Sequence, residues 1–237
     1  MASAELVVPA DSLRTSTTAF EPDARSRMTL RLRADGTTSV VSLDERYAAV
    51  SGFELTMDVP LDIRVHFETA KNLYLYAWFV YRFYPVAEQQ ALATLEFALR
   101  ERLALMFPDR FGSAAKQSSS LSRLLKTARN EKLITNASLR CKDRLAHLRA
   151  HDRAGMELMR KMQAIGLSEM PFDRLLVEPT LEDYAHDWLE TFTETLPFVR
   201  NTYAHGTFTL HSNVLGTFEI VTDLVNQLYP ANMTRKS

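Results

Sequence analysis

The sequence predicts a mainly α-helical protein with a small N-terminal β-hairpin, and three observations support this fold class. Apolar residues recur at three- and four-residue spacing over most of residues 61–230, which is typical of amphipathic helices. Residues 28–33 instead alternate apolar and polar side chains, and the turn dipeptide Asp35-Gly36 separates them from a second extended stretch at 37–41. The 237 residues are 46% hydrophobic and 24% charged, the composition of a globular protein with a sizeable core.

The chain divides into three parts by the character of its sequence. Residues 1–60 predict a β or irregular segment packed on the main domain, residues 61–230 a helical domain, and residues 231–237 a C-terminal tail. In the first part, strands are expected at 28–32 and 37–41, and a further extended piece at 53–57 before Pro60. The function of this segment does not follow from its sequence.

The helical part contains a series of amphipathic segments separated by breakers. Helices are expected from residue 61 until Pro85 interrupts the first, then at 86–107, 121–133, 138–164, 181–203 and 213–228. Residues 108–120, which contain Gly112 and a serine run, are expected to form a loop. Thr180 begins a capping-box pattern before the penultimate helix, and Pro197 inside that helix predicts a kink or break. Gly206 is expected to end it.

Composition excludes several functional classes. Cys141 is the only cysteine, which rules out an internal disulfide and a cysteine-based zinc site and fits a reducing, cytoplasmic compartment. The most apolar run, residues 73–81, is too short to span a bilayer, and residues 1–10 lack the features of a signal peptide, so no membrane association or export is expected. The seven scattered glycines form no phosphate-binding loop.

The charges are unevenly distributed although the formal net charge is only −1. Residues 113–161 contain twelve Lys or Arg against four Asp or Glu, whereas residues 162–204 contain eight acidic residues against two basic ones. The basic segment is either a solvated helical face or a cationic track for a nucleic-acid backbone. Five of its residues are candidates for contacting RNA: Arg140, Lys142, Arg144, Arg149 and Arg153.

The stretch 200–206, RNTYAHG, joins a permanent cation, an amide and an imidazole within two helical turns. Asn201 and His205 are four residues apart and therefore share one helix face, which the long Arg200 side chain can reach from the next. Arginine pairs with phosphate oxygens, and histidine both takes and returns a proton near neutral pH. These residues are therefore the candidate catalytic group, although His205 could instead only cap the helix before Gly206.

The arrangement Arg200-Asn201-x-x-x-His205 resembles the motif of the HEPN superfamily (higher eukaryote and prokaryote nucleotide-binding domains). Its context, residues 196–206 (LPFVRNTYAHG), is similar to a form found in uncharacterised and defence-associated bacterial members. An earlier segment with Glu88, Glu96 and Arg100 resembles the HEPN helix that presents a glutamate to the motif. The resemblance covers about residues 61–230 and implies a HEPN-like helical bundle.

The resemblance implies a metal-independent endoribonuclease without a cofactor. Two protomers would pair so that both motifs line one cleft, His205 would transfer protons at the ribose 2′-OH and the leaving oxygen, and Arg200 would steady the phosphate. Cleavage would leave a cyclic phosphate. Some such enzymes are toxins or phage-defence effectors, so an antitoxin protein is an expected partner. The alternative is a non-catalytic HEPN-type module that binds a nucleotide or a protein.

Four further residues are candidates for supporting this site. Glu96 and Arg100 could complete it or could be an ordinary ion pair four residues apart on one helix. Tyr203 falls on the apolar stripe and is expected to belong to the core, and His211 is either a second proton carrier or a solvated loop residue. His147 and His151 lack the glutamate of a zinc-protease motif, so no metal site is predicted.

Overall fold

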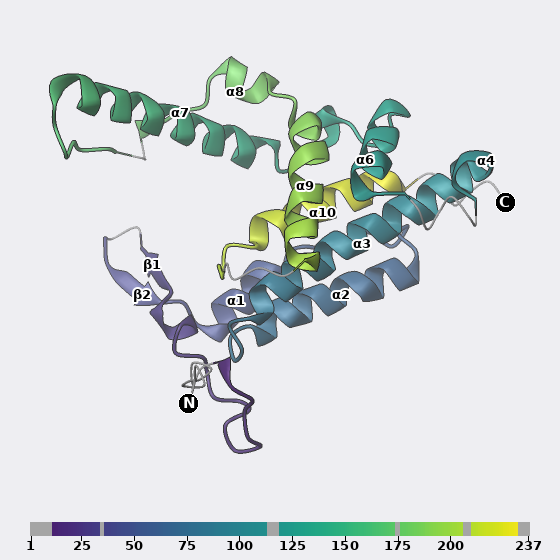
Figure 1. Ribbon diagram of the computed structural model, residues 1–237, viewed down its shortest axis with the longest axis horizontal. Helices are drawn as coiled ribbons and strands as arrows, with labels where there is room; N and C mark the ends of the chain where they lie inside the picture. Colours follow the sequence, from purple (N-terminus) through teal and green to yellow (C-terminus); the bar gives the residue numbers. More distant parts are fainter. Residues whose placement is uncertain (1–10, 34–35, 113–118, 174–175, 206–209, 232–237) are drawn as a thin grey trace, which may run out of the picture.

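The structure is a computed structural model that describes residues 11–33, 36–112, 119–173, 176–205 and 210–231. In these residues it is mainly helical, with one small antiparallel sheet, as the sequence predicts (Figure 1). Its elements are η2 (Ser26–Met28), β1 (Leu30–Leu32), β2 (Thr38–Val40), α1 (Leu43–Ser51), α2 (Leu61–Tyr76), α3 (Phe83–Met106), α4 (Pro108–Phe111), α6 (Leu121–Asn130), η3 (Asn136–Ser138), α7 (Lys142–Ile165), α8 (Leu181–Ala185), α9 (Trp188–Ala204) and α10 (Leu215–Leu228). None of these helices combines the length and apolarity needed to cross a membrane.

The N-terminal part contains the predicted hairpin and an additional helix. β1 and β2 pair antiparallel with Leu30 opposite Val40, and their side chains are mostly exposed. The prediction of an extended piece at 53–57 was wrong in that no strand forms there, and α1 precedes it. Ser42 caps α1 by accepting a hydrogen bond from the Glu45 backbone N–H, and the Glu45 carboxylate accepts one from the Ser42 N–H in return.

The core lies where α3 packs against α2 on one side and α10 on another. Figure 1 shows the three helices running alongside one another, with α1 against α2. Tyr84, Phe67 and Phe218 are among the largest completely buried side chains of this core. The helical structure is interrupted at residues 77–82, between α2 and α3, and so before Pro85 rather than at it. Pro85 occupies the first turn of α3, where a backbone N–H needs no partner within the helix.

Helix α9, which ends in the RNTYAH stretch, lies across α3 and also packs on α6 (Figure 1). The single helix expected at 181–203 is interrupted at His186 and Asp187, and the Asp187 side chain caps α9. A break at Pro197, one of the two expected outcomes, does not occur, and α9 continues through residue 197. Pro197 has no N–H to donate to the Thr193 carbonyl. That carbonyl instead accepts a hydrogen bond from the Ser122 hydroxyl at 3.3 Å.

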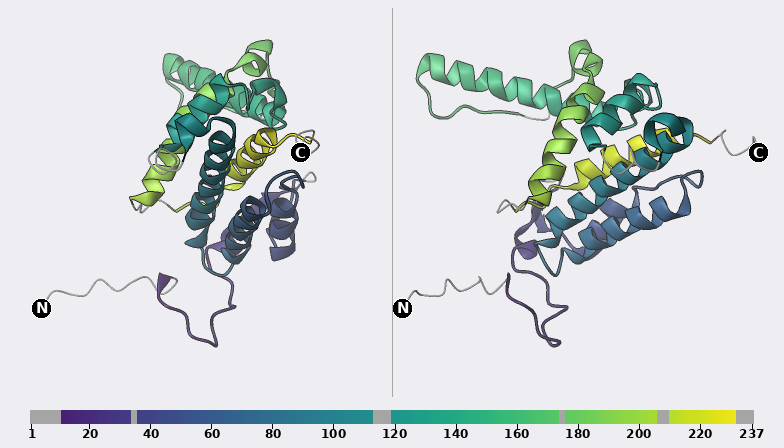
Figure 2. Two further views of the ribbon diagram at one scale, coloured as in Figure 1. Left: turned by 90° about the vertical axis from the view of Figure 1, so that its right-hand side faces the viewer. Right: turned by 45° about the vertical axis from the view of Figure 1, so that its right-hand side comes forward.

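The basic helix α7 packs against α8, and its C-terminal half extends away from the bundle (Figures 1 and 2). Arg153 of α7 donates to the Asp183 carboxylate of α8 at 2.7 Å. The structure begins α7 four residues later than predicted, because Asn136–Ser138 forms the separate turn η3. Likewise α6 ends at Asn130 and α10 begins at Leu215, differences of two or three residues from the predicted ends.

Candidate active site

Arg200 is held by a glutamate from the helix beneath it. Its Nε donates to Oε2 of Glu96 at 3.2 Å, and the Glu96 side chain on α3 is only 11% exposed. Oε1 of the same carboxylate accepts a hydrogen bond from Arg100, one turn further along α3. Because two guanidinium groups share one carboxylate, the trio carries a net charge of +1 and stays attractive to an anion.

A polar pocket of about 350 Å³ lies beside this trio, between α3, the beginning of α6 and α9. It is lined by Glu96, Arg100, Ser119, Ser120, Leu121, Ser122, Pro197, Arg200 and Asn201. Ser120 caps α6 by accepting from the Arg123 N–H at 3.4 Å, so the first turn of that helix faces the pocket with its partial positive charge. Two arginines, serine hydroxyls and a helix N-terminus are groups that bind phosphate.

Asn201 lines this pocket, whereas His205 does not. Asn201 is exposed and lines the pocket, with its Oδ1 3.5 Å from Nη1 of Arg200. His205 caps the C-terminus of α9, where its backbone N–H donates to the Asn201 carbonyl at 3.0 Å. Its side chain is exposed, and among the described residues none forms a hydrogen bond with the imidazole. Gly206, expected to end the helix, lies outside the described residues.

A second polar cluster lies one turn beyond Arg200 on α9. The Tyr203 hydroxyl donates to the Glu88 carboxylate and lies 2.8 Å from Nε2 of His211. Thr217 of α10 donates to the other Glu88 oxygen, and the Glu88 side chain is 6% exposed. Burial and the Glu88 carboxylate raise the pKa of the Tyr203 hydroxyl, so it remains a proton donor to Glu88 at neutral pH.

The two clusters are separate positions along one helix. Glu88 and Glu96 are eight residues apart on α3, which corresponds to about 12 Å along the helix axis. His211 is tied to Glu88 and Arg200 to Glu96, so these contacts do not bring His211 and Arg200 to one phosphate. Glu88, Glu96 and Arg100 were expected on one helix, and α3 contains all three. Thr217 was not identified as a partner of Glu88, because nothing local marks a contact 129 residues away.

Three of the five basic residues expected to contact RNA form ion pairs with acidic side chains. Arg144 pairs with Glu219, while Arg149 and Arg153 lie 3.5 and 2.7 Å from the Asp183 carboxylate. The other two, Arg140 and Lys142, have no described carboxylate within the 4.0 Å of an ion pair. The basic segment of the sequence is therefore partly neutralised in the fold by residues of α8 and α10.

The two histidines of α7 do not form a metal site with the residues that the structure describes. Nδ1 of His147 lies 3.0 Å from the backbone carbonyl of Asp143. Within the described ranges, no group of three His, Cys, Asp or Glu side chains is placed to hold a metal ion.

Comparisons with known proteins identified no relative of this chain. No model of a protein family, no curated protein sequence and no solved structure matches the chain.

Proposed function

We propose that the protein is a HEPN-type endoribonuclease that cleaves RNA without a metal ion, through attack of the ribose 2′-OH. The observation that carries the proposal is the pairing of Arg100 and Arg200 with one carboxylate, Glu96, beside a polar pocket. Such a pocket suits a phosphodiester, and the residues that form it include the Arg and Asn of the motif. The resemblance of residues 196–206 to HEPN motifs supports the same assignment.

Arg200 would stabilise the phosphate as negative charge builds on it. Its Nε is used by Glu96, whereas no described residue accepts a hydrogen bond from Nη2. That N–H group is therefore available to a phosphate oxygen, and the Glu96 contact limits the rotation of the guanidinium before the substrate arrives. Preorganised donors of this kind contribute more than donors that must first be ordered.

His205 would move the protons. It would take the proton from the 2′-OH as that oxygen attacks phosphorus, and the bond to the 5′-oxygen of the next nucleotide would break. The leaving oxygen requires a proton in turn, which the same histidine of a second protomer would supply. Products would be a 2′,3′-cyclic phosphate and a 5′-hydroxyl, with no net gain or loss of protons.

The proposed enzyme is therefore a homodimer in which both motifs line one cleft. His205 is exposed at the end of α9, about 6 Å along the axis from Asn201, so a strand bound in the pocket can extend to it. In such an assembly RNA is the substrate, and a neutralising antitoxin or a role in phage defence would follow the pattern of toxin-type HEPN proteins.

The direct test is incubation of purified protein with total RNA in the presence of EDTA. We expect wild-type protein to fragment RNA and leave DNA intact, because only RNA supplies the 2′-OH. End-group analysis should identify cyclic phosphates. Intact RNA after incubation with wild type, or equal cleavage by a variant with Arg200→Ala and His205→Ala, would show that the catalytic assignment is wrong.

A second candidate is a non-catalytic module that binds a phosphate-containing ligand in the same pocket. The observation in its favour is that His205 is not among the residues that line the pocket. Binding to a short oligoribonucleotide distinguishes the two. Affinity that needs Arg200 but not His205, without cleavage products, favours the binding module.

A further inference from the structure

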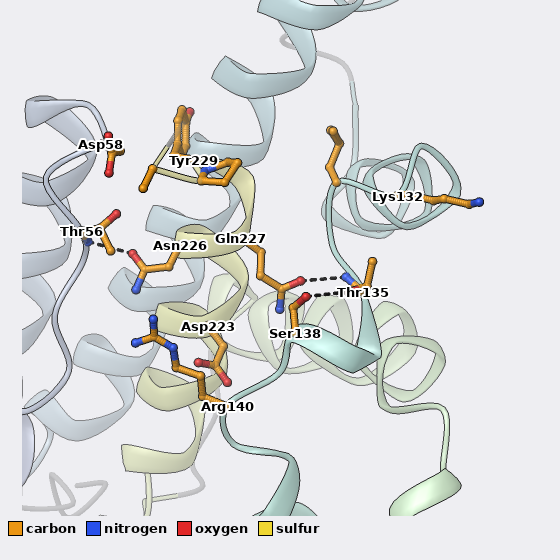
Figure 3. Close-up of a pocket in the computed structure, with 13 residues that line it drawn as sticks. Thr56, Asp58, Lys132, Thr135, Ser138, Arg140, Asp223, Asn226, Gln227 and Tyr229 are labelled. Atoms are coloured by element: carbon orange, nitrogen blue, oxygen red, sulfur yellow. Dashed lines mark hydrogen bonds between the residues drawn. The ribbon is translucent and has the colours of Figure 1, made fainter. Parts of the chain in front are cut away.

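A second pocket, of about 370 Å³, lies at the C-terminal half of α10 and shares no lining residue with the Arg200 pocket (Figure 3). Three segments meet there: the chain after α1, the connection from α6 to α7, and α10 with the residues that follow it. Its lining consists of Thr56, Asp58, Lys132, Leu133, Thr135, Ser138, Arg140, Asp223, Asn226, Gln227, Tyr229, Pro230 and Ala231. A cavity of this size accommodates a small polar ligand.

Gln227 holds a hydrogen-bond donor at this pocket that none of the described residues satisfies. Its Oε1 accepts a hydrogen bond from the Thr135 backbone N–H at 2.8 Å, which fixes the orientation of the amide because a backbone N–H can only donate. Nε2 is consequently turned away from Thr135, and it is buried without an acceptor among the described residues. A buried amide N–H group without a protein partner is uncommon, and a water molecule or a bound ligand can supply its acceptor.

Asp223 places a carboxylate one helical turn before this amide. The two residues are four apart on α10, so their Cβ atoms are about 6 Å apart on one helix face. One oxygen of Asp223 accepts from the Cys141 backbone N–H at 2.8 Å, and the residue is 6% exposed. The pocket therefore presents an N–H donor next to a carboxylate. Guanine offers the matching edge, with the O6 acceptor beside the N1–H and N2–H donors.

Two further groups of the pocket suit the rest of a nucleotide. Arg140 is exposed, and none of the carboxylates in the described part of the chain lies within ion-pair distance of it. In Figure 3 its side chain runs beside α10 on the side of Thr56 and Asn226. The Thr56 hydroxyl is buried without a partner among the described residues, whereas its backbone N–H is bound by Asn226 at 2.8 Å. A cation and a hydroxyl are what phosphate and ribose require.

We propose that this pocket binds a guanine mononucleotide, with the base on Gln227 and Asp223 and the phosphate on Arg140. The site is separate from the proposed nuclease centre and does not depend on it, so its test needs no activity measurement. Asn226 anchors the segment around Thr56 to α10 through both of its amide atoms, so the pocket wall exists before a ligand binds.

Calorimetric titration of the full chain with GMP, AMP, guanosine and inorganic phosphate tests the proposal. GMP should bind at least about tenfold more tightly than AMP, because adenine offers a donor where Gln227 also donates. Guanosine should bind more weakly than GMP, and phosphate alone more weakly still. Equal binding of GMP and AMP, or no binding of GMP at millimolar concentration, overturns the proposal.

Matched variants locate the site. Gln227→Glu keeps an acceptor for the Thr135 N–H but removes the donor, so GMP affinity should fall about tenfold or more. Arg140→Gln should lower the affinity for GMP to that for guanosine and leave guanosine unchanged. Arg160→Gln, at an exposed arginine of α7, should change neither. If GMP binds both pocket variants as tightly as it binds wild type, the pocket is not its site, whatever the stability of Gln227→Glu.

Discussion

Nε of Arg200 lies 3.2 Å from Oε2 of Glu96, a contact that joins α9 to α3 across 104 residues of sequence. Since Arg100 uses the other oxygen of the same carboxylate, Glu96 controls the position of both cations that line the pocket. Arg200 itself remains 39% exposed, so it is oriented by the protein and still accessible to a ligand. The proposed catalysis therefore depends on a residue outside the motif.

Replacing Glu96 by Gln should lower the cleavage rate by about tenfold to a hundredfold, because it removes the charge that orients both arginines. We expect the free energy of unfolding to fall by about 1 kcal/mol. The fall is this small because Arg200 is partly exposed and solvent weakens its ion pair. Initial rates on RNA and urea denaturation measure the two effects. Glu169→Gln, at an exposed position, serves as the control. An unchanged rate for Glu96→Gln would mean that Glu96 does not position Arg200 for catalysis.

The Ser122 hydroxyl should stabilise the Thr193 carbonyl by replacing the backbone N–H that proline lacks at residue 197. Ser122→Ala should cost about 1 kcal/mol in the wild-type background, since the carbonyl loses its donor. In a Pro197→Ala background the new backbone N–H can serve Thr193, so the same substitution should cost less. A double-mutant cycle on unfolding free energies measures the difference. Equal costs in both backgrounds would show that the two donors do not substitute for each other.

The contact between α7 and α8 should lose strength in acid. The Arg153 guanidinium, together with the Thr180 backbone N–H, holds the pKa of the Asp183 carboxyl well below its usual range. Its stabilisation is therefore complete above about pH 4, where an unfolded aspartate ionises, and is lost progressively as the pH falls toward the native pKa.

Urea midpoints of wild type and Asp183→Asn at pH 7, 5 and 3 test this expectation. Wild type should be the more stable protein at pH 7 and pH 5, and the difference should narrow at pH 3. Asp152→Asn, at an exposed position of the same helix pair, provides the comparison. A difference that stays constant down to pH 3 would contradict the ion-pair assignment.

The proposed dimer predicts that inactive protomers suppress active ones. When wild-type protein is mixed with an excess of His205→Ala protein and allowed to exchange subunits, most wild-type chains enter mixed dimers with a single imidazole. Activity per wild-type chain should then fall severalfold, whereas an equal mass of unrelated protein should have no effect. Undiminished activity in the mixture would indicate that one protomer cleaves RNA alone.

Periodicity and turn chemistry predicted most of the fold because they are local. The hairpin follows from the alternation at 28–33 and the turn at Asp35-Gly36, and the helices that became α3, α9 and α10 follow from their apolar stripes. Helix α1 was missed although Ser42 and Glu45 form a capping box at its beginning, a signal visible in the sequence. Its weakly patterned residues gave no apolar stripe to support that signal.

The candidate site was predicted only in part, because its contacts depend on tertiary structure. Spacing grouped Glu96 with Arg100, but which side chains meet Arg200 depends on how α9 crosses α3. Tyr203 was expected in the core and His211 either at the site or in solvent, and both are instead half-buried, where they contact each other and Glu88. The basic segment suggested an RNA track from charge alone, and the acidic residues that neutralise part of it come from distant helices.

The proposed nuclease activity is best tested by measuring the rate at which a defined RNA is cleaved in EDTA. The proteins compared are wild type and the single variants Arg200→Ala and His205→Ala. We expect cyclic-phosphate products from wild type and a cleavage rate lower by about a hundredfold or more in each variant. His205→Ala should unfold at the same urea concentration as wild type, whereas Arg200→Ala should unfold at a slightly lower one because Glu96 loses one of its two arginine partners. Cleavage by His205→Ala at the wild-type rate, or no cleavage by any of the three proteins, would contradict the proposal.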